Sequence, residues 1–158
     1  ELQAVQKTSP VAQQLRQVPG IGLLGATALA ATLGDGTGWR NARQFAWCMG
    51  LTPAHAGTGG KVRMGSISKK GDPYIRTLLV SGANSLLNCA KKDPWLQALL
   101  QRRPRNVVVV ALANKLARTA WALVAKARRY DPAWRSVPPQ RPQPTIDHDR
   151  QGPVMVNA

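Results

Sequence analysis

Acidic side chains are scarce in this chain of 158 residues, which has seven Asp and Glu against 22 Lys and Arg and a formal net charge of +15. Between residues 2 and 130 only Asp35, Asp72 and Asp93 remain, and the last two each precede a proline, a pattern typical of helix N-caps. Metal-dependent phosphoryl transfer usually relies on several carboxylates that converge on the ions. We therefore expect no metal or other cofactor within this chain, and its charge predicts a polyanionic partner.

Cysteine, histidine and long apolar runs are also scarce. The two cysteines, Cys48 and Cys89, lie far apart, with no second cysteine or histidine at metal-binding spacing. This excludes a zinc motif and favours a reducing, cytoplasmic location over a disulfide. No uninterrupted apolar run approaches the roughly 20 residues that span a membrane, and no signal peptide is visible, so we expect no membrane partner. Because the chain begins at Glu1 and its first methionine is Met49, we interpret it as part of a longer protein.

The patterns that are present predict one all-α domain over residues 1–130. Val107–Val110 has the β-branched side chains of a strand, but the apolar spacing that continues to Trp121 favours a helix. We expect the five tryptophans to be mostly core residues. The last 28 residues, 131–158, contain six of the twelve prolines and predict a disordered tail. Helices are expected at 10–17, 23–33, 42–49, 73–91, 94–102 and 105–129.

Residues 51–71 are rich in glycine and basic residues and have no helical period, which predicts a long loop, part of which could instead form a short hairpin. Within it, Ser66 and Ser68 stand among cations that would stabilise an alkoxide attacking a phosphodiester. The alternative is a solvated loop whose serines only make turns. The cations available to phosphates are Lys61, Arg63, Lys69, Lys70 and Arg76.

Two further segments suggest contact with nucleic acid. Val18–Ala26 resembles the hairpin of a helix-hairpin-helix motif, in which Gly20 and Gly22 would let backbone N–H groups approach a phosphate. The alternative is a tight turn between packed helices. The second segment brackets the start of the last helix, and its basic residues suit a nucleic-acid backbone, although a solvated face would look the same. They are Arg102, Arg103, Arg105, Lys115 and Arg118.

Six segments occur in an order and spacing that cover roughly residues 10–130: 18–22, 42–53, 59–71, 75–79, 102–106 and 113–122. Together they resemble the C-terminal half of the DEDD-type insertion-sequence transposases, the IS110 family with its IS1111 subgroup. Asp72, where that family more often has Asn, is a mild departure that preserves helix capping. The larger departure is that the acidic N-terminal half is not in this chain.

The resemblance implies a DNA recombinase that mobilises an insertion sequence. It also implies an N-terminal RuvC-like domain, absent from this fragment, that binds Mg²⁺, a structured guide RNA that selects DNA, and assembly into homo-oligomers. The serine of the family's Ile-Ser-Lys-x-Gly motif matches Ser68, which we rank above Ser66 as the nucleophile. The fragment alone is expected to be inactive. The alternative functions are a non-catalytic helix-hairpin-helix module that binds nucleic acid, and a purely structural oligomerisation domain.

Overall fold

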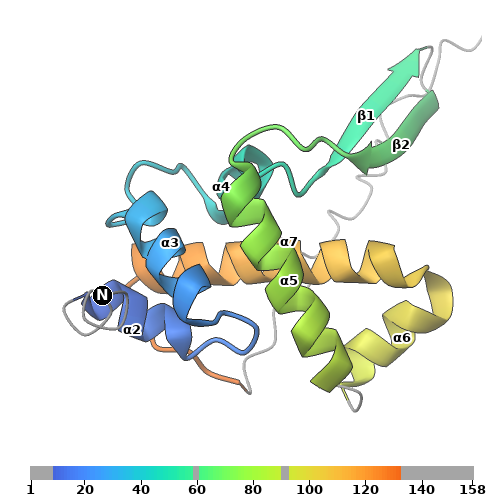
Figure 1. The fold of residues 1–158 in the computed structure, drawn as a ribbon. Coiled ribbons are helices and arrows are strands. Elements are labelled where there is room, and N and C mark those ends of the chain that lie inside the picture. The colour runs from blue at the N-terminus through green and yellow to red at the C-terminus, as the bar shows by residue number, and fades with distance from the viewer. Residues whose placement is uncertain (1–8, 59–60, 90–92, 133–158) are drawn as a thin grey trace, which may run out of the picture.

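The computed structural model describes residues 9–58, 61–89 and 93–132, which form six helices and one two-stranded antiparallel sheet (Figure 1). The expectation of a mostly helical domain is confirmed, and the helix bounds differ from the predicted ones by a few residues at most. The tail predicted for residues 131–158 lies outside the described residues except for its first two. The elements in order are α2 (Pro10–Arg16), α3 (Leu23–Leu33), α4 (Ala42–Cys48), β1 (Pro53–Thr58), β2 (Lys61–Ile67), α5 (Pro73–Cys89), α6 (Pro94–Arg102) and α7 (Arg105–Ala125).

Polar side chains cap four of the six described helices, and two of these caps, Asp72 and Asp93, are ones that the sequence predicted. Ser9 Oγ accepts a hydrogen bond from the backbone of α2, and Asn41 Oδ1 accepts one from the backbone of α4. The Asp72 carboxylate accepts two N–H groups at the start of α5, and Asp93 does the same for α6. Asp35 instead closes a turn after α3, where hydrogen bonds from Thr37 lower the pKa of its carboxyl group. All three acidic residues between positions 2 and 130 therefore serve local backbone structure.

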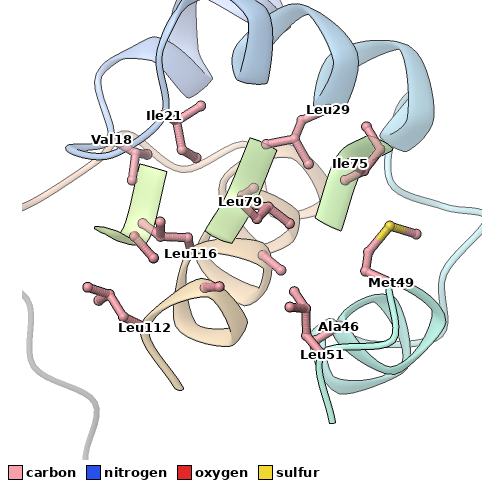
Figure 2. Close-up of a cluster of buried hydrophobic side chains, with 14 of the residues drawn as sticks. Val18, Ile21, Leu29, Ala46, Met49, Leu51, Ile75, Leu79, Leu112 and Leu116 are labelled. Carbon is pink, nitrogen blue, oxygen red and sulfur yellow. The ribbon is translucent and has the colours of Figure 1, made fainter. Parts of the chain in front are cut away.

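The core is centred on α7, which crosses behind α5 and also contacts α2, α3, α4 and α6 (Figure 1). Val108 and Val109 are buried in its second turn while Val107 is half exposed, so the Val107–Val110 run is helical, as the periodicity predicted. Figure 2 shows the apolar side chains that meet between the helices. They include Val18, Ile21, Leu29, Ala46, Met49, Leu51, Ile75, Leu79, Leu112 and Leu116.

Glycine permits one close crossing in this core. A Cβ on Gly82 of α5 would lie 1.8 Å from the carbonyl oxygen of Gly20, in the turn between α2 and α3. Gly20 itself has a φ of +89°, a conformation that favours glycine. The turn therefore packs directly against the backbone of α5.

Two predictions need correction. The segment predicted as a long glycine-rich loop is largely the β1–β2 hairpin, the alternative left open above, and it projects away from the helices (Figure 1). Among the tryptophans, Trp39 and Trp121 pack against the core, but Trp47 and Trp95 are 59% and 43% exposed. Trp134 lies outside the described residues.

Among the residues that the structure describes, one helix is long and apolar enough to cross a membrane by length and composition alone. It is α7, although no continuous apolar run of that length is visible in the sequence. Eight of its residues are buried in the core described above, which is the ordinary reason for such a composition in a central helix.

Candidate nucleophile and nucleic-acid interface

Ser68 lies where the chain leaves the hairpin. Its backbone N–H donates to the carbonyl oxygen of Thr52 at 2.9 Å, which continues the ladder by one pair beyond Pro53 and Ile67. The next N–H, of Lys69, donates to the carbonyl oxygen of Gly50 at 3.2 Å. Residues before the hairpin are therefore joined by backbone hydrogen bonds to residues after it. We call these two segments, residues 50–52 and 68–71, the root of the hairpin.

Two glycines let the serine segment contact the end of α4. A Cβ on Gly71 would lie 1.6 Å from the carbonyl oxygen of Cys48, and one on Gly50 would lie 2.3 Å from that of Lys70. Both have positive φ angles, +97° and +69°. No larger side chain fits at either position without displacing backbone, so the two segments hold one another in place.

Polar side chains from α5 and α7 fix the same root. Arg76 Nη1 donates to the carbonyl oxygen of Met49 at 3.2 Å, and Asn114 Nδ2 donates to that of Leu51 at 3.3 Å. One nitrogen of Arg76, predicted to bind phosphate, thus serves the fold, while its side chain remains partly exposed. Sequence reasoning did not single out Asn114, because a single polar residue in an amphipathic helix gives no signal of a distant acceptor.

The two candidate serines differ in environment. Ser66, in β2, is exposed, whereas the Oγ atom of Ser68 is buried and has no hydrogen-bond partner among the described residues. Lys69 and Lys70 follow Ser68 directly and are both exposed. Lys69 has a φ of +54°, an unusual conformation for a residue other than glycine. Backbone strain of this kind, together with an unpartnered buried hydroxyl, is typical of functional sites.

The structure divides the predicted phosphate-binding cations into separate groups. Lys61 and Arg63 belong to β2, although their side chains lie outside the described part. Lys69 and Lys70 lie just before the first residue of α5. A second group surrounds the other end of α5, where Arg105 Nη2 donates to Asn84 at 2.8 Å and to Asn88 at 2.9 Å. The 17 residues of α5 separate the two groups by about 25 Å.

Most of the cations in the second group have partners within the protein. Arg102 Nε donates to the carbonyl oxygen of Ala98, one turn earlier in α6. Lys115 Nζ lies 4.4 Å from the ring centroid of Trp95, a cation–π contact between α7 and α6. Arg103 and Arg118 are exposed, and their side chains make no hydrogen bond or ion pair within the described ranges 9–58, 61–89 and 93–132.

The turn between α2 and α3 gives its two candidate glycines different positions. Gly20 is half-buried against α5, whereas Gly22 is exposed at the N-cap of α3 with no heavy atom within 4 Å of a built Cβ. Of the two, Gly22 has the space for an external phosphate. The helix-hairpin-helix interpretation of this turn stays a prediction.

The described residues contain no group of three or more His, Cys, Asp and Glu side chains that could hold a metal ion. The resemblance assigns Mg²⁺ to the N-terminal domain, and the described residues offer no set of donors that would hold it.

Comparison with known proteins decides the family. The family model described as "Transposase IS116/IS110/IS902 family" matches residues 12–101, more than half of the chain. The chain belongs to this family. The resemblance drawn from the sequence segments is thereby confirmed.

Several curated proteins are similar to this chain, and two of the three described here are named as transposases. A "Probable family 20 transposase" of Pseudomonas aeruginosa is 50% identical over 125 residues, which cover 76% of this chain and 37% of the relative. The "Transposase for insertion sequence element IS1111A" of Coxiella burnetii is 39% identical over 135 residues, covering 82% and 37%. A "Pilin gene-inverting protein" of Moraxella lacunata is 25% identical over 126 residues, covering 76% and 38%. The chain therefore spans little more than a third of the length of these relatives.

Proposed function

We propose that this chain is the C-terminal part of a transposase that mobilises an insertion sequence by recombining DNA, and that Ser68 is its nucleophile. The observation that carries the proposal is the environment of Ser68. Its hydroxyl is unpartnered, and it precedes two exposed lysines, the first of which has a strained backbone. Its backbone is hydrogen-bonded to Thr52, and contacts with α4, α5 and α7 hold the neighbouring residues of the hairpin root. A nucleophile held in this way loses little conformational entropy when it attacks.

The chemistry is an exchange of one phosphodiester for another. Ser68 Oγ would bond to the phosphorus while the bond from phosphorus to a deoxyribose oxygen breaks, the serine proton is released and the leaving oxygen takes up a proton. Attack by a hydroxyl of another DNA strand on the serine phosphate would reverse these changes and join new ends. Because each step conserves the number of phosphodiester bonds, no nucleotide hydrolysis is required.

The exposed lysines supply the electrostatic part of the proposal. Lys69 and Lys70 would offset the negative charge that accumulates on the phosphate oxygens during attack. In the described conformation Ser68 Oγ is covered, and a change of χ1 rotamer would move it without moving the backbone. Mg²⁺, if the enzyme uses it, would be held by the acidic residues of an N-terminal RuvC-like domain and not by this chain.

The binding partners are DNA and a structured guide RNA, with the longer protein acting as a homo-oligomer in the cytoplasm. The formal charge of +15 supports a nucleic-acid partner. The cations at the two ends of α5 and the exposed Gly22 would then contact separate stretches of backbone. Such contacts position nucleic acid but do not read its sequence.

A second candidate function is a non-catalytic module that binds nucleic acid, and the buried state of Ser68 Oγ favours it. The two functions differ in one product, since only the recombinase forms a covalent adduct between DNA and a serine. Retention of labelled DNA by the complete transposase on a denaturing gel would distinguish them.

The decisive variant is Ser68→Ala in the complete transposase that contains this chain. We expect recombination and the covalent adduct to fall by about 10³-fold or more, because the nucleophile is lost, with DNA affinity changed less than about twofold. Ser66→Ala is the matched control, since it removes an exposed hydroxyl from the same strand end and should leave recombination intact. Full recombination by the Ser68→Ala variant would refute the assignment.

A further inference from the structure

Thr52 lies directly opposite Ser68 at the root of the hairpin. Pro53 pairs with Ile67 in the antiparallel ladder, so the next pair outward is Thr52 with Ser68, and the backbone hydrogen bond between them confirms this register. Side chains of directly opposed residues point to the same face of an antiparallel pair, with Cβ atoms about 4.5–5.5 Å apart. The two hydroxyl-bearing side chains are therefore neighbours.

Both hydroxyls are buried, and neither has a hydrogen-bond partner among the described residues. In the described conformation the two hydroxyls do not hydrogen-bond to each other. A hydroxyl can donate one hydrogen bond and accept others, so a change of χ1 rotamer at Ser68 could join them. Hydrogen bonds between opposed Thr and Ser side chains are a recognised element of antiparallel sheets. Burial of two unpartnered hydroxyls is unfavourable, and in native proteins each such group requires an explanation.

We propose that Thr52 is the positioning residue for Ser68: in the rotamer that attacks DNA, the Ser68 hydroxyl donates its hydrogen to Thr52 Oγ1, and this bond directs an oxygen lone pair of Ser68 toward the scissile phosphate. This inference rests on the proposed role of Ser68. Thr52 transfers no proton and makes no bond to DNA in this scheme. It acts through the rotamer of the nucleophile.

The surroundings of Thr52 suit such a role. Its own backbone follows Leu51, whose carbonyl oxygen accepts from Asn114 of α7, and its carbonyl oxygen accepts from the N–H of Ser68. Threonine is branched at Cβ and therefore has few χ1 rotamers, so its hydroxyl has a narrow range of positions. A stiff side chain on a fixed backbone can hold a neighbouring hydroxyl in one direction.

The test uses Thr52→Val and Thr52→Ser in the complete transposase, with adduct formation measured in a single turnover at saturating DNA. Valine keeps the shape of threonine and removes the hydroxyl, whereas serine keeps the hydroxyl. We expect Thr52→Val to slow adduct formation about 10–100-fold, with the Kd for DNA changed less than about twofold, because misplacing a reacting group costs that order in rate. Thr52→Ser should retain a rate within about threefold of the parent.

Two controls keep the result interpretable. Thr77→Val removes a hydroxyl that donates to Pro73 within α5, away from Ser68, and should leave the rate unchanged. The melting temperature of the DNA-free Thr52→Val variant should be equal to or above that of the parent, since in the described conformation the lost hydroxyl is buried and has no partner.

Specific outcomes would overturn the inference. A normal rate for Thr52→Val would show that Ser68 needs no partner at this position. An equally slow Thr52→Ser would show that the methyl group, and not the hydroxyl, matters. If Ser68→Ala still recombined DNA, the proposed nucleophile itself would be wrong, a result distinct from an active Thr52→Val in a protein that requires Ser68.

Discussion

The helical core and the root of the hairpin are built on different principles. The core consists mostly of apolar side chains that repeat at helical spacing on α3, α5 and α7, and packing of this kind tolerates changes that preserve volume (Figure 2). The root consists of backbone contacts between segments about 20 residues apart in sequence, at Gly50 and Gly71. There the fit is between main-chain atoms, which cannot repack.

This difference predicts where small substitutions do most damage. In the core a large side chain must be truncated to lose several kcal/mol. At the root a single added methyl group overlaps a carbonyl group. A change from glycine to alanine at the root, which holds Ser68, should therefore lower the free energy of unfolding more than a similarly small change among the core side chains.

The largest effect is expected from Gly71→Ala. The substitution adds a Cβ at 1.6 Å from the carbonyl oxygen of Cys48, at a φ of +97°, and we expect it to lower the free energy of unfolding by about 3 kcal/mol or more. Chemical denaturation of this chain, after a check that it unfolds cooperatively, measures the change.

Alanine substitutions at two other glycines separate the steric clash from the backbone strain as causes of the lost stability. Gly34 has a φ of +58° but open space around its Cβ position, so Gly34→Ala should cost only about 1–2 kcal/mol from strain. Gly38 has open space and no positive φ, and Gly38→Ala should stay within about 0.5 kcal/mol of the parent. Equal losses of unfolding free energy in Gly71→Ala and Gly38→Ala would contradict the predicted clash with the Cys48 carbonyl oxygen.

An intermediate effect is expected where a turn meets the core. Gly82→Ala improves helix propensity but places a Cβ 1.8 Å from the Gly20 carbonyl oxygen, and we expect a net loss of about 2 kcal/mol. Gly25 lies in α3, and a Cβ there would make an ordinary contact with Ile21 at 3.6 Å, so Gly25→Ala should stabilise the protein by about 0.5–1 kcal/mol. The difference in denaturation midpoint between these two helical variants tests the crossing, and a stabilised Gly82→Ala variant would contradict it.

The sequence predicted the helices well because their signals are local. Asp72 and Asp93 cap helices as their Asp-Pro pairs indicated, and the apolar spacing of α7 overrode the β-branched run at Val107–Val110. The family was also predictable, since it depends on short segments in order.

The arrangement of the site was not predictable in the same way. The partnership of Gly71 with the end of α4 and the bonds of Arg76 and Arg105 depend on contacts between distant segments. Sequence reasoning assigned both arginines to phosphates because the sequence does not distinguish an exposed guanidinium from one that is hydrogen-bonded within the protein. The pairing of Thr52 with Ser68 depends on the hairpin register, which becomes readable only once the loop is recognised as two strands.

The smallest effect is expected at Lys69, where fold and function make opposite demands. Glycine adopts its φ of +54° without strain, so Lys69→Gly should stabilise the chain by up to about 1 kcal/mol. The same substitution removes an exposed charge, so the slope of log K against log salt for DNA binding should become shallower by about 0.9.

Lys70→Gly is the matched control: it removes the same charge at the next residue, where no positive φ is relieved, and should change the slope without stabilising the fold. If Lys69→Gly were stabilised and bound DNA with an unchanged salt slope, Lys69 would be a strained residue without a phosphate partner. If the salt slope became shallower in both variants and only Lys69→Gly were stabilised, the protein would be shown to accept backbone strain at Lys69 in order to keep a lysine beside Ser68.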